Sequence, residues 1–252
     1  MDIEILKQKQ DKINQESLNE IYNDLPDALI NLTNNTTLNY CLHEIKSGTK
    51  TGQSARVLHN WISNEIIQVD GNDKGKIRRF DRLESIWLNI VVEARKFGIP
   101  LEDLKQARTE LFKSNIKNFS LLKFSVLDSI LRKPKMLVIF ESGHVQHFSL
   151  ETYAKWVTKG LFRTHLNFNL LDFIQAEYPK NAFSVDFKLE NAFEDTNKLK
   201  MLYFLKTGDY KFIKLFINDT DVRLIETSQM LSENKDLMKV LSDWKFMKAE
   251  II

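Results

Sequence analysis

The sequence predicts an α+β protein that is mostly helical and has two parts. Helix-like segments alternate with short strand-like segments along its 252 residues. Its 43% hydrophobic and 28% charged residues are typical of a soluble globular protein. Eight Gly and four Pro are too few for a large all-β fold with many tight turns. A shift in composition near Ser114 indicates a domain boundary.

This boundary gives three predicted regions. Residues 1–37 are predicted to form a polar arm, because their apolar residues are irregularly spaced. Residues 38–113 are predicted to form an N-terminal domain, and residues 114–252 a C-terminal α+β module for dimerisation or interaction.

The N-terminal domain is predicted to contain helices and one basic hairpin. In order we expect helices over 38–46 and 55–64, strands over 66–69 and 77–80, and helices over 82–96 and 101–112. Gly48 is expected to cap the first helix and Ser54 to begin the second. In the second helix Leu58 and Trp61 share one face, which predicts that both lie in the core.

The C-terminal module is predicted from apolar runs and turn residues. We expect helices over 120–131, 149–159, 169–178, 195–206 and 233–248, and strands over 135–140, 144–148, 165–168, 210–217 and 222–227. Gly143 is expected in a turn, and Gly208 is expected to end a helix. Residues 179–192 have a mixed pattern with no assigned element.

Positive charge is concentrated between residues 46 and 80. The whole chain carries only +2, whereas this stretch has seven Lys/Arg and three acidic residues, an excess of four positive charges. The basic run at residues 74–81 lies between helical segments, an order typical of a winged helix-turn-helix. Such a module places a helix in the major groove of DNA and a basic wing on the phosphates.

Three motifs resemble the DNA-binding domain of the MerR (mercury-resistance-regulator) family. The recognition-helix pattern is matched by Thr51, Gly52, Ser54, Leu58 and Trp61. The wing pattern is matched by Arg78, Arg79, Phe80 and Asp81. The joint between the next two helices is matched by Gly98, Ile99, Pro100, Leu101, Glu102, Asp103, Leu104 and Lys105. The resemblance covers about residues 38–113, and His59 and Glu65 depart from the family pattern.

The resemblance implies a bacterial regulator of transcription that binds specific double-stranded DNA. The single cysteine and an N-terminus unlike a signal peptide predict a cytoplasmic protein. The expected DNA-binding residues are Ser54, Arg56, His59, Asn60, Lys76, Arg78 and Arg79. The two wing arginines, assisted by Lys76, are expected on phosphates, where a guanidinium donates two hydrogen bonds. Arg56 is a candidate for a guanine edge and equally for a phosphate.

A homodimer is expected, because one recognition helix reads only a few base pairs. Relatives dimerise through a long helix after the DNA-binding domain, but residues 118–132 offer only about two heptads, so the dimer surface is expected in the C-terminal module. RNA polymerase or another protein is left open as a further partner.

Two other function classes remain open. An excisionase-like architectural factor of a mobile element would share the winged fold and bend DNA, but such proteins are usually much smaller. A protein-interaction module that has lost DNA binding is the other alternative, and the basic wing argues against it.

The sequence argues against several kinds of site. No apolar run is long enough for a membrane span, and the acidic N-terminus does not resemble a signal peptide. The single cysteine, Cys41, is expected to be buried and structural. His144 and His147 are expected on opposite faces of a strand, which disfavours a metal site. No nucleophile or phosphate-loop motif is present, so we expect no enzyme activity and no cofactor.

Overall fold

The computed structural model describes residues 8, 12, 26–48, 51–69, 78–116, 119–160, 164–179, 182–183 and 187–252. The chain divides into two compact units, which we call the first and the second unit. The first is built mainly from residues 33–174, and the second from residues 26–32 and 175–252. The expected α+β class is confirmed, because each unit combines helices with small antiparallel sheets.

The N-terminal part of the first unit consists of helices and two very short strands. These are α3 (Thr36–Asn39), the π-helical turn η1 (Tyr40–Glu44), β1 (Ser47–Gly48), α4 (Ala55–Ser63), β2 (Arg79–Phe80), α5 (Arg82–Lys96) and α6 (Leu101–Phe112). Gly98, with φ of +81°, follows the end of α5 in a conformation that favours glycine. The helices predicted over 55–64, 82–96 and 101–112 are confirmed, and the first helix begins two residues earlier than expected.

Helix α7 (Leu121–Leu131) is buried in the first unit. It follows the short hairpin of β3 (Ser114–Ile116) and β4 (Phe119–Ser120). Every residue from Leu122 to Leu131 is buried, as expected for a helix that is apolar around most of its circumference. A dimeric coiled coil needs an exposed apolar stripe. Helix α7 therefore does not provide the long dimer helix of the resembled family.

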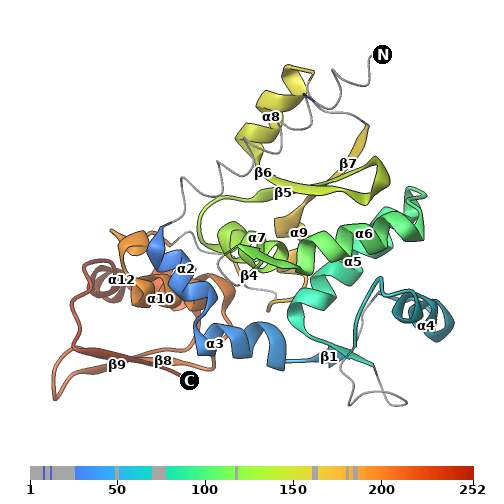
Figure 1. Ribbon diagram of the computed structural model, residues 1–252. Helices are drawn as coiled ribbons and strands as arrows, with labels where there is room; N and C mark the ends of the chain where they lie inside the picture. Colours follow the sequence, from blue (N-terminus) through green and yellow to red (C-terminus); the bar gives the residue numbers. More distant parts are fainter. Residues whose placement is uncertain are drawn as a thin grey trace. The chain divides into compact units, whose positions relative to one another are not determined.

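An antiparallel sheet with the order β6-β5-β7 also lies in the first unit (Figure 1). Its strands are β5 (Lys135–Phe140), β6 (Val145–Ser149) and β7 (His165–Asn169), and they are followed by α8 (Leu150–Thr158) and α9 (Leu170–Gln175). Ser149 begins α8, and its Oγ accepts a hydrogen bond from the Thr152 backbone N at 3.2 Å. A buried apolar cluster is formed by Val138, Phe140, Phe148 and Trp156.

A close joint connects α6 with this sheet. The turn η3 (Glu141–Gly143) lies against α6, and a Cβ at Gly143 would overlap the backbone of Asp103. Glu110 on α6 accepts a hydrogen bond from the Val145 backbone N at 3.0 Å and pairs with His144 Nδ1 at 2.8 Å. The predicted turn at Gly143 is confirmed, and the contact with α6 explains why no larger residue fits there.

The second unit combines helices with the sheet β10-β8-β9. Its elements are α2 (Asp27–Thr33, whose last residue belongs to the first unit), η4 (Ala192–Glu194), α10 (Thr196–Thr207), β8 (Ile213–Phe216), β9 (Val222–Ile225), α11 (Ser228–Glu233), α12 (Lys235–Ser242) and β10 (Lys248–Ile251). Asn218 Oδ1 accepts hydrogen bonds from the backbone N of Thr220 at 2.9 Å and of Asp221 at 2.8 Å, which closes the predicted β8–β9 hairpin. Gly208 ends α10 as expected.

The prediction of a strand over 66–69 is wrong. Glu65 has a φ of +60°, and the chain turns there after α4. Ile66 and Ile67 are buried, and the Ile66 carbonyl accepts a hydrogen bond from Trp87 Nε1 at 2.7 Å. The backbone N–H groups of Ile66 and Ile67 bond to the Trp61 carbonyl at the end of α4. The segment's backbone is therefore satisfied by α4 and by side chains instead of by a strand partner. The strand Arg79–Phe80 pairs with β1, so Gly48 belongs to a strand and does not cap the first helix.

Two C-terminal predictions also need correction. The helix predicted over 233–248 is shorter, because α12 ends at Ser242 and the chain continues into β10. Strand β10 pairs with β8, and this pairing satisfies backbone groups that a local helix pattern does not reveal. Helix α9 ends at Gln175, three residues before the predicted end.

The contact-defined units differ in extent from the predicted regions. The predicted boundary at residues 113/114 lies within the first unit, and residues 26–32 of the predicted arm belong to the second. None of the described helices combines the length and the apolar character needed to cross a membrane.

Candidate nucleic-acid interface

Helix α4 presents one polar face to solvent. Ser54 caps the helix, since its Oγ accepts a hydrogen bond from the Val57 backbone N at 3.3 Å. The opposite face is buried through Leu58 and Trp61, as predicted. All four predicted DNA-binding residues of this segment are exposed: Ser54, Arg56, His59 and Asn60. Of these, the side chains of Arg56, His59 and Asn60 make no hydrogen bond or ion pair to another described residue.

The end of the predicted wing lies at the start of α4. Arg78 Nη1 donates a hydrogen bond to the Ala55 carbonyl oxygen at 2.8 Å. The next residue, Arg79, pairs through its backbone with Gly48 and has an exposed side chain. The two arginines therefore have different surroundings. The predicted wing turn, with Lys76, lies outside the described residues.

The last two residues of the wing motif have structural roles. Phe80 is only 1% exposed and belongs to the core. Asp81 caps α5, because its Oδ1 accepts a hydrogen bond from the Glu84 backbone N at 2.7 Å. Its Oδ2 lies 3.2 Å from His43 Nδ1 on η1. Asp81 thus joins the first helical segment to the strand–helix junction.

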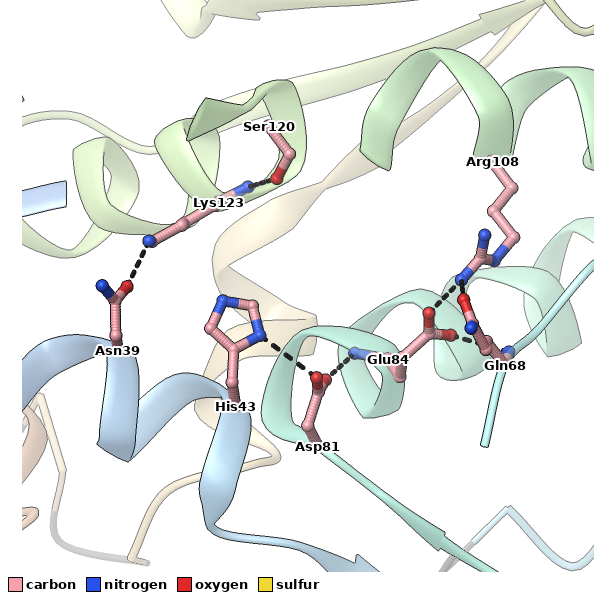
Figure 2. Close-up of polar contacts among 8 residues, drawn as sticks. All are labelled: Asn39, His43, Gln68, Asp81, Glu84, Arg108, Ser120 and Lys123. Carbon is pink, nitrogen blue, oxygen red and sulfur yellow. Dashed lines mark hydrogen bonds and ion pairs between the residues drawn. The ribbon is translucent and has the colours of Figure 1, made fainter. Parts of the chain in front are cut away.

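Glu84 and Arg108 form an ion pair that is largely shielded from solvent. Figure 2 shows Glu84 between Arg108 of α6 and Gln68, which follows α4. Glu84 Oε2 accepts a hydrogen bond from the Gln68 backbone N at 3.1 Å, and its other oxygen pairs with Arg108 Nη2. Arg108 Nη2 also lies 3.1 Å from Gln68 Oε1. One carboxylate therefore connects α5, α6 and the chain leaving α4.

Burial dominates the charge balance of Glu84. It raises the pKa of this carboxyl to about 7, although the adjacent Arg108 acts in the opposite direction. Sequence reasoning did not identify Glu84 or Arg108. The spacing of Asp81 and Glu84, three residues apart before an apolar helix, is the available signal, because it matches a helix-capping pattern.

A second polar contact, which is part-buried, connects α3 with α7. Lys123 Nζ donates a hydrogen bond to Asn39 Oδ1 (Figure 2). Burial lowers the pKa of Lys123. Cys41, close by in the sequence, is buried as expected.

An open hollow of about 620 Å³ lies beside β2. It is bordered by η1, β2, α5 and α6. The charged residues that line it are Lys46, Arg79, Arg108, Lys113, Asp81 and Glu84. Basic side chains outnumber acidic ones, and His43 and Phe112 also contribute to the wall.

No group of three or more His, Cys, Asp or Glu side chains is placed to hold a metal ion in the part of the chain that the structure describes. Comparison with known protein families, with curated proteins and with solved structures finds no match to this chain.

Proposed function

We propose that residues 38–113 bind specific double-stranded DNA and that the protein regulates transcription. In this proposal α4 enters the major groove, and the basic hairpin before β2 lies on flanking phosphates. The proposed contacts come from α4 and its cap through Ser54, Arg56, His59 and Asn60, and from the wing through Lys76, Arg78 and Arg79.

The observation that carries this proposal is the outward polar face of α4 together with its link to the wing. Arg56, His59 and Asn60 are exposed while Leu58 and Trp61 anchor the helix from behind. The hydrogen bond from Arg78 to the Ala55 carbonyl holds the wing end at the start of α4. If the helix in the groove and the strand on the phosphates are already held at a fixed spacing, less conformational entropy is lost on binding DNA.

Local charge supports the same proposal. The stretch from residue 46 to residue 80 has seven Lys/Arg against three acids, within a chain of net charge +2. A concentrated positive surface attracts the phosphate backbone and releases its counterions. Exposed polar side chains on the adjacent helix supply donors and acceptors that distinguish base edges.

A second copy of the chain is part of the proposal. One helix covers only a few base pairs, whereas two copies reading half-sites about 34 Å apart multiply specificity. Because α7 is buried, its surface is not available for pairing, and the dimer contact must use other parts of the chain. RNA polymerase or another protein remains a candidate partner for the complex on DNA.

Selection from a pool of random duplexes with the full-length protein tests the proposal. We expect one enriched sequence that binds about 10³-fold or more tightly than unrelated duplex at the same salt concentration. The variant Arg56→Ala/Asn60→Ala should lose most of this preference. The matched control Lys155→Ala/Lys159→Ala changes two exposed residues of α8 and the segment after it, and should keep the preference.

Three outcomes separate the alternatives. No DNA binding by the folded protein contradicts the proposal and favours the protein-interaction module. Tight binding with strong bending but without an enriched sequence favours the architectural factor. Equal loss in both double variants would mean that α4 has no special role.

A further inference from the structure

Two cationic side chains that line the hollow beside β2, Arg79 and Lys113, do not stabilise the fold through polar contacts with other described residues. The side chains of Arg79 and Lys113 make no ion pair or hydrogen bond to another described residue. Arg79 comes from β2 at the end of the predicted wing, and Lys113 directly follows α6, so residues far apart in sequence converge. Surface cations normally remain in water, but here two of them border a concave space of about 620 Å³.

A third cation, Arg108, is held in place by the fold. Its guanidinium carbon lies 4.4 Å from the centre of the Phe112 ring, and its Nη2 contacts Glu84 and Gln68. Its side chain is 15% exposed, and its Nε has no hydrogen-bond partner among the described residues. The guanidinium is therefore oriented before any ligand arrives, which lowers the cost of binding.

The two acidic residues that line the hollow, Asp81 and Glu84, already have partners in the fold. Asp81 caps α5 and contacts His43. Glu84 pairs with Arg108 and accepts a hydrogen bond from the Gln68 backbone N, and burial raises its pKa to about 7. The positive charge in the hollow is thus only partly compensated.

We propose that this hollow binds a phosphorylated small molecule, with Arg79 and Lys113 on the phosphate and Arg108 oriented at the wall. Guanidinium and ammonium groups are the side chains that recognise phosphate. Phe112 and Val69 supply apolar wall for the rest of the ligand. A volume of about 620 Å³ is within the range of small-molecule sites.

If the protein binds DNA as proposed, a ligand in the hollow should compete with DNA; this step rests on the proposed function. Arg79 is assigned both to a DNA phosphate and to the ligand phosphate, so the two must compete. Thermodynamic linkage then requires that the ligand weakens DNA binding and that DNA weakens ligand binding by the same factor. The phosphorylated ligand would release the protein from DNA.

The test uses the full-length protein without DNA and three probes: pyrophosphate, AMP and adenosine. Calorimetric titration should give saturable binding of the two phosphate compounds and none of adenosine. Lys113→Ala and Arg79→Ala should each weaken binding about tenfold or more, the effect of removing one charge-assisted hydrogen bond. Lys155→Ala, an exposed charge on α8, is the matched control and should leave binding unchanged.

A DNA titration with the same variants distinguishes a free phosphate from the DNA backbone. If Lys113→Ala weakens DNA binding while neither phosphate probe binds, the hollow serves the backbone and the small-molecule proposal is overturned. It is also overturned if the probes bind equally to wild type and to Lys113→Ala. Specific phosphate binding in a protein that binds no DNA would support the hollow and reject the regulator.

Discussion

The four residues of the wing motif show how neighbouring positions divide between surface and core. Arg78 reaches back to the Ala55 carbonyl, and Arg79 borders the hollow. Phe80 is buried and Asp81 caps α5, so both would be retained by a protein that binds nothing. Only the first two positions carry information about a ligand.

Arg56 provides a prediction for a single residue. If its guanidinium reads a base edge, Arg56→Ala should relax the preference at one base position by roughly 1–3 kcal/mol. Fluorescence anisotropy with the selected duplex and its single-base variants measures this. An equal loss of affinity on every sequence would show a phosphate contact instead, and Lys155→Ala serves as the control.

His147 provides a second prediction, about stability. Its Nδ1 hydrogen-bonds Ser125 Oγ in the buried core, and its Nε2 has no hydrogen-bond partner among the described residues. Burial, with a smaller contribution from nearby Lys135, lowers the pKa of His147 to about 3, and Asp128 acts in the opposite direction. The folded protein therefore keeps this ring neutral, whereas the unfolded chain protonates it below about pH 6.5.

The direction in which stability changes with pH follows from which state binds more protons. Between pH 6.5 and 3 the unfolded chain binds more protons at this site, so stability falls as pH falls, by up to about 1.4 kcal/mol per pH unit. His147→Asn should reduce this slope in urea unfolding experiments above and below pH 6.5, even if it lowers stability at every pH. The exposed His59→Asn should leave the slope unchanged. An unaltered slope in His147→Asn would contradict the buried neutral state.

At the scale of elements, β1 and β2 place the wing end between α4 and the hollow. The strands are only two residues long, so side chains hold the arrangement together. The Arg78–Ala55 bond fixes one side, and the Glu84–Arg108–Gln68 contacts fix the base (Figure 2).

A prediction for the wing as an element concerns its two arginines. Arg78→Ala/Arg79→Ala should weaken binding to all duplexes and reduce the log–log salt dependence by about 0.9 for each phosphate that the variant no longer neutralises. Affinity measured at several salt concentrations gives this slope. Circular dichroism verifies that the variant is folded. A folded double variant with the wild-type slope would remove the wing from the interface, and Lys155→Ala/Lys159→Ala is again the control.

For the whole chain, where the domain boundary lies decides which fragments should fold. Composition predicts separable regions 38–113 and 114–252, whereas contacts group residues 33–174 together. A cut at residue 113 would separate α6 from Gly143, which lies against Asp103, and from Val145, which bonds to Glu110. It would also expose the apolar surface between α6 and α7.

We therefore expect the fragment 33–174 to unfold cooperatively in urea and the fragment 38–113 to be unfolded or aggregated. Sedimentation of the same fragments and of the full chain tests the dimer, which is expected for the full chain. A cooperative, monomeric 38–113 fragment would support the composition boundary instead. A monomeric full chain, with and without DNA, would defeat the two-half-site proposal.

Local sequence patterns predict most of the helices and suggest the candidate contact residues. Periodic apolar positions and caps such as Ser54 and Gly98 are local signals, so α4, α5 and α6 could be located without a structure. The exposure of Arg56 follows from the same helical period, because Leu58 and Trp61 fix the buried face.

Tertiary structure decided the strand pairing and the hollow. The segment 66–69, mostly β-branched, resembles a strand. Its backbone instead bonds to the Trp61 carbonyl and to the side chains of Trp87 and Glu84, which are distant in sequence. The final strand β10 likewise depends on β8. The hollow brings Arg79 close to Lys113 and Arg108, and the contact between Glu84 of α5 and Arg108 of α6 helps to set this arrangement. Local patterns report which face of an element is apolar, but partners across the chain are chosen by burial and hydrogen bonding in the folded whole.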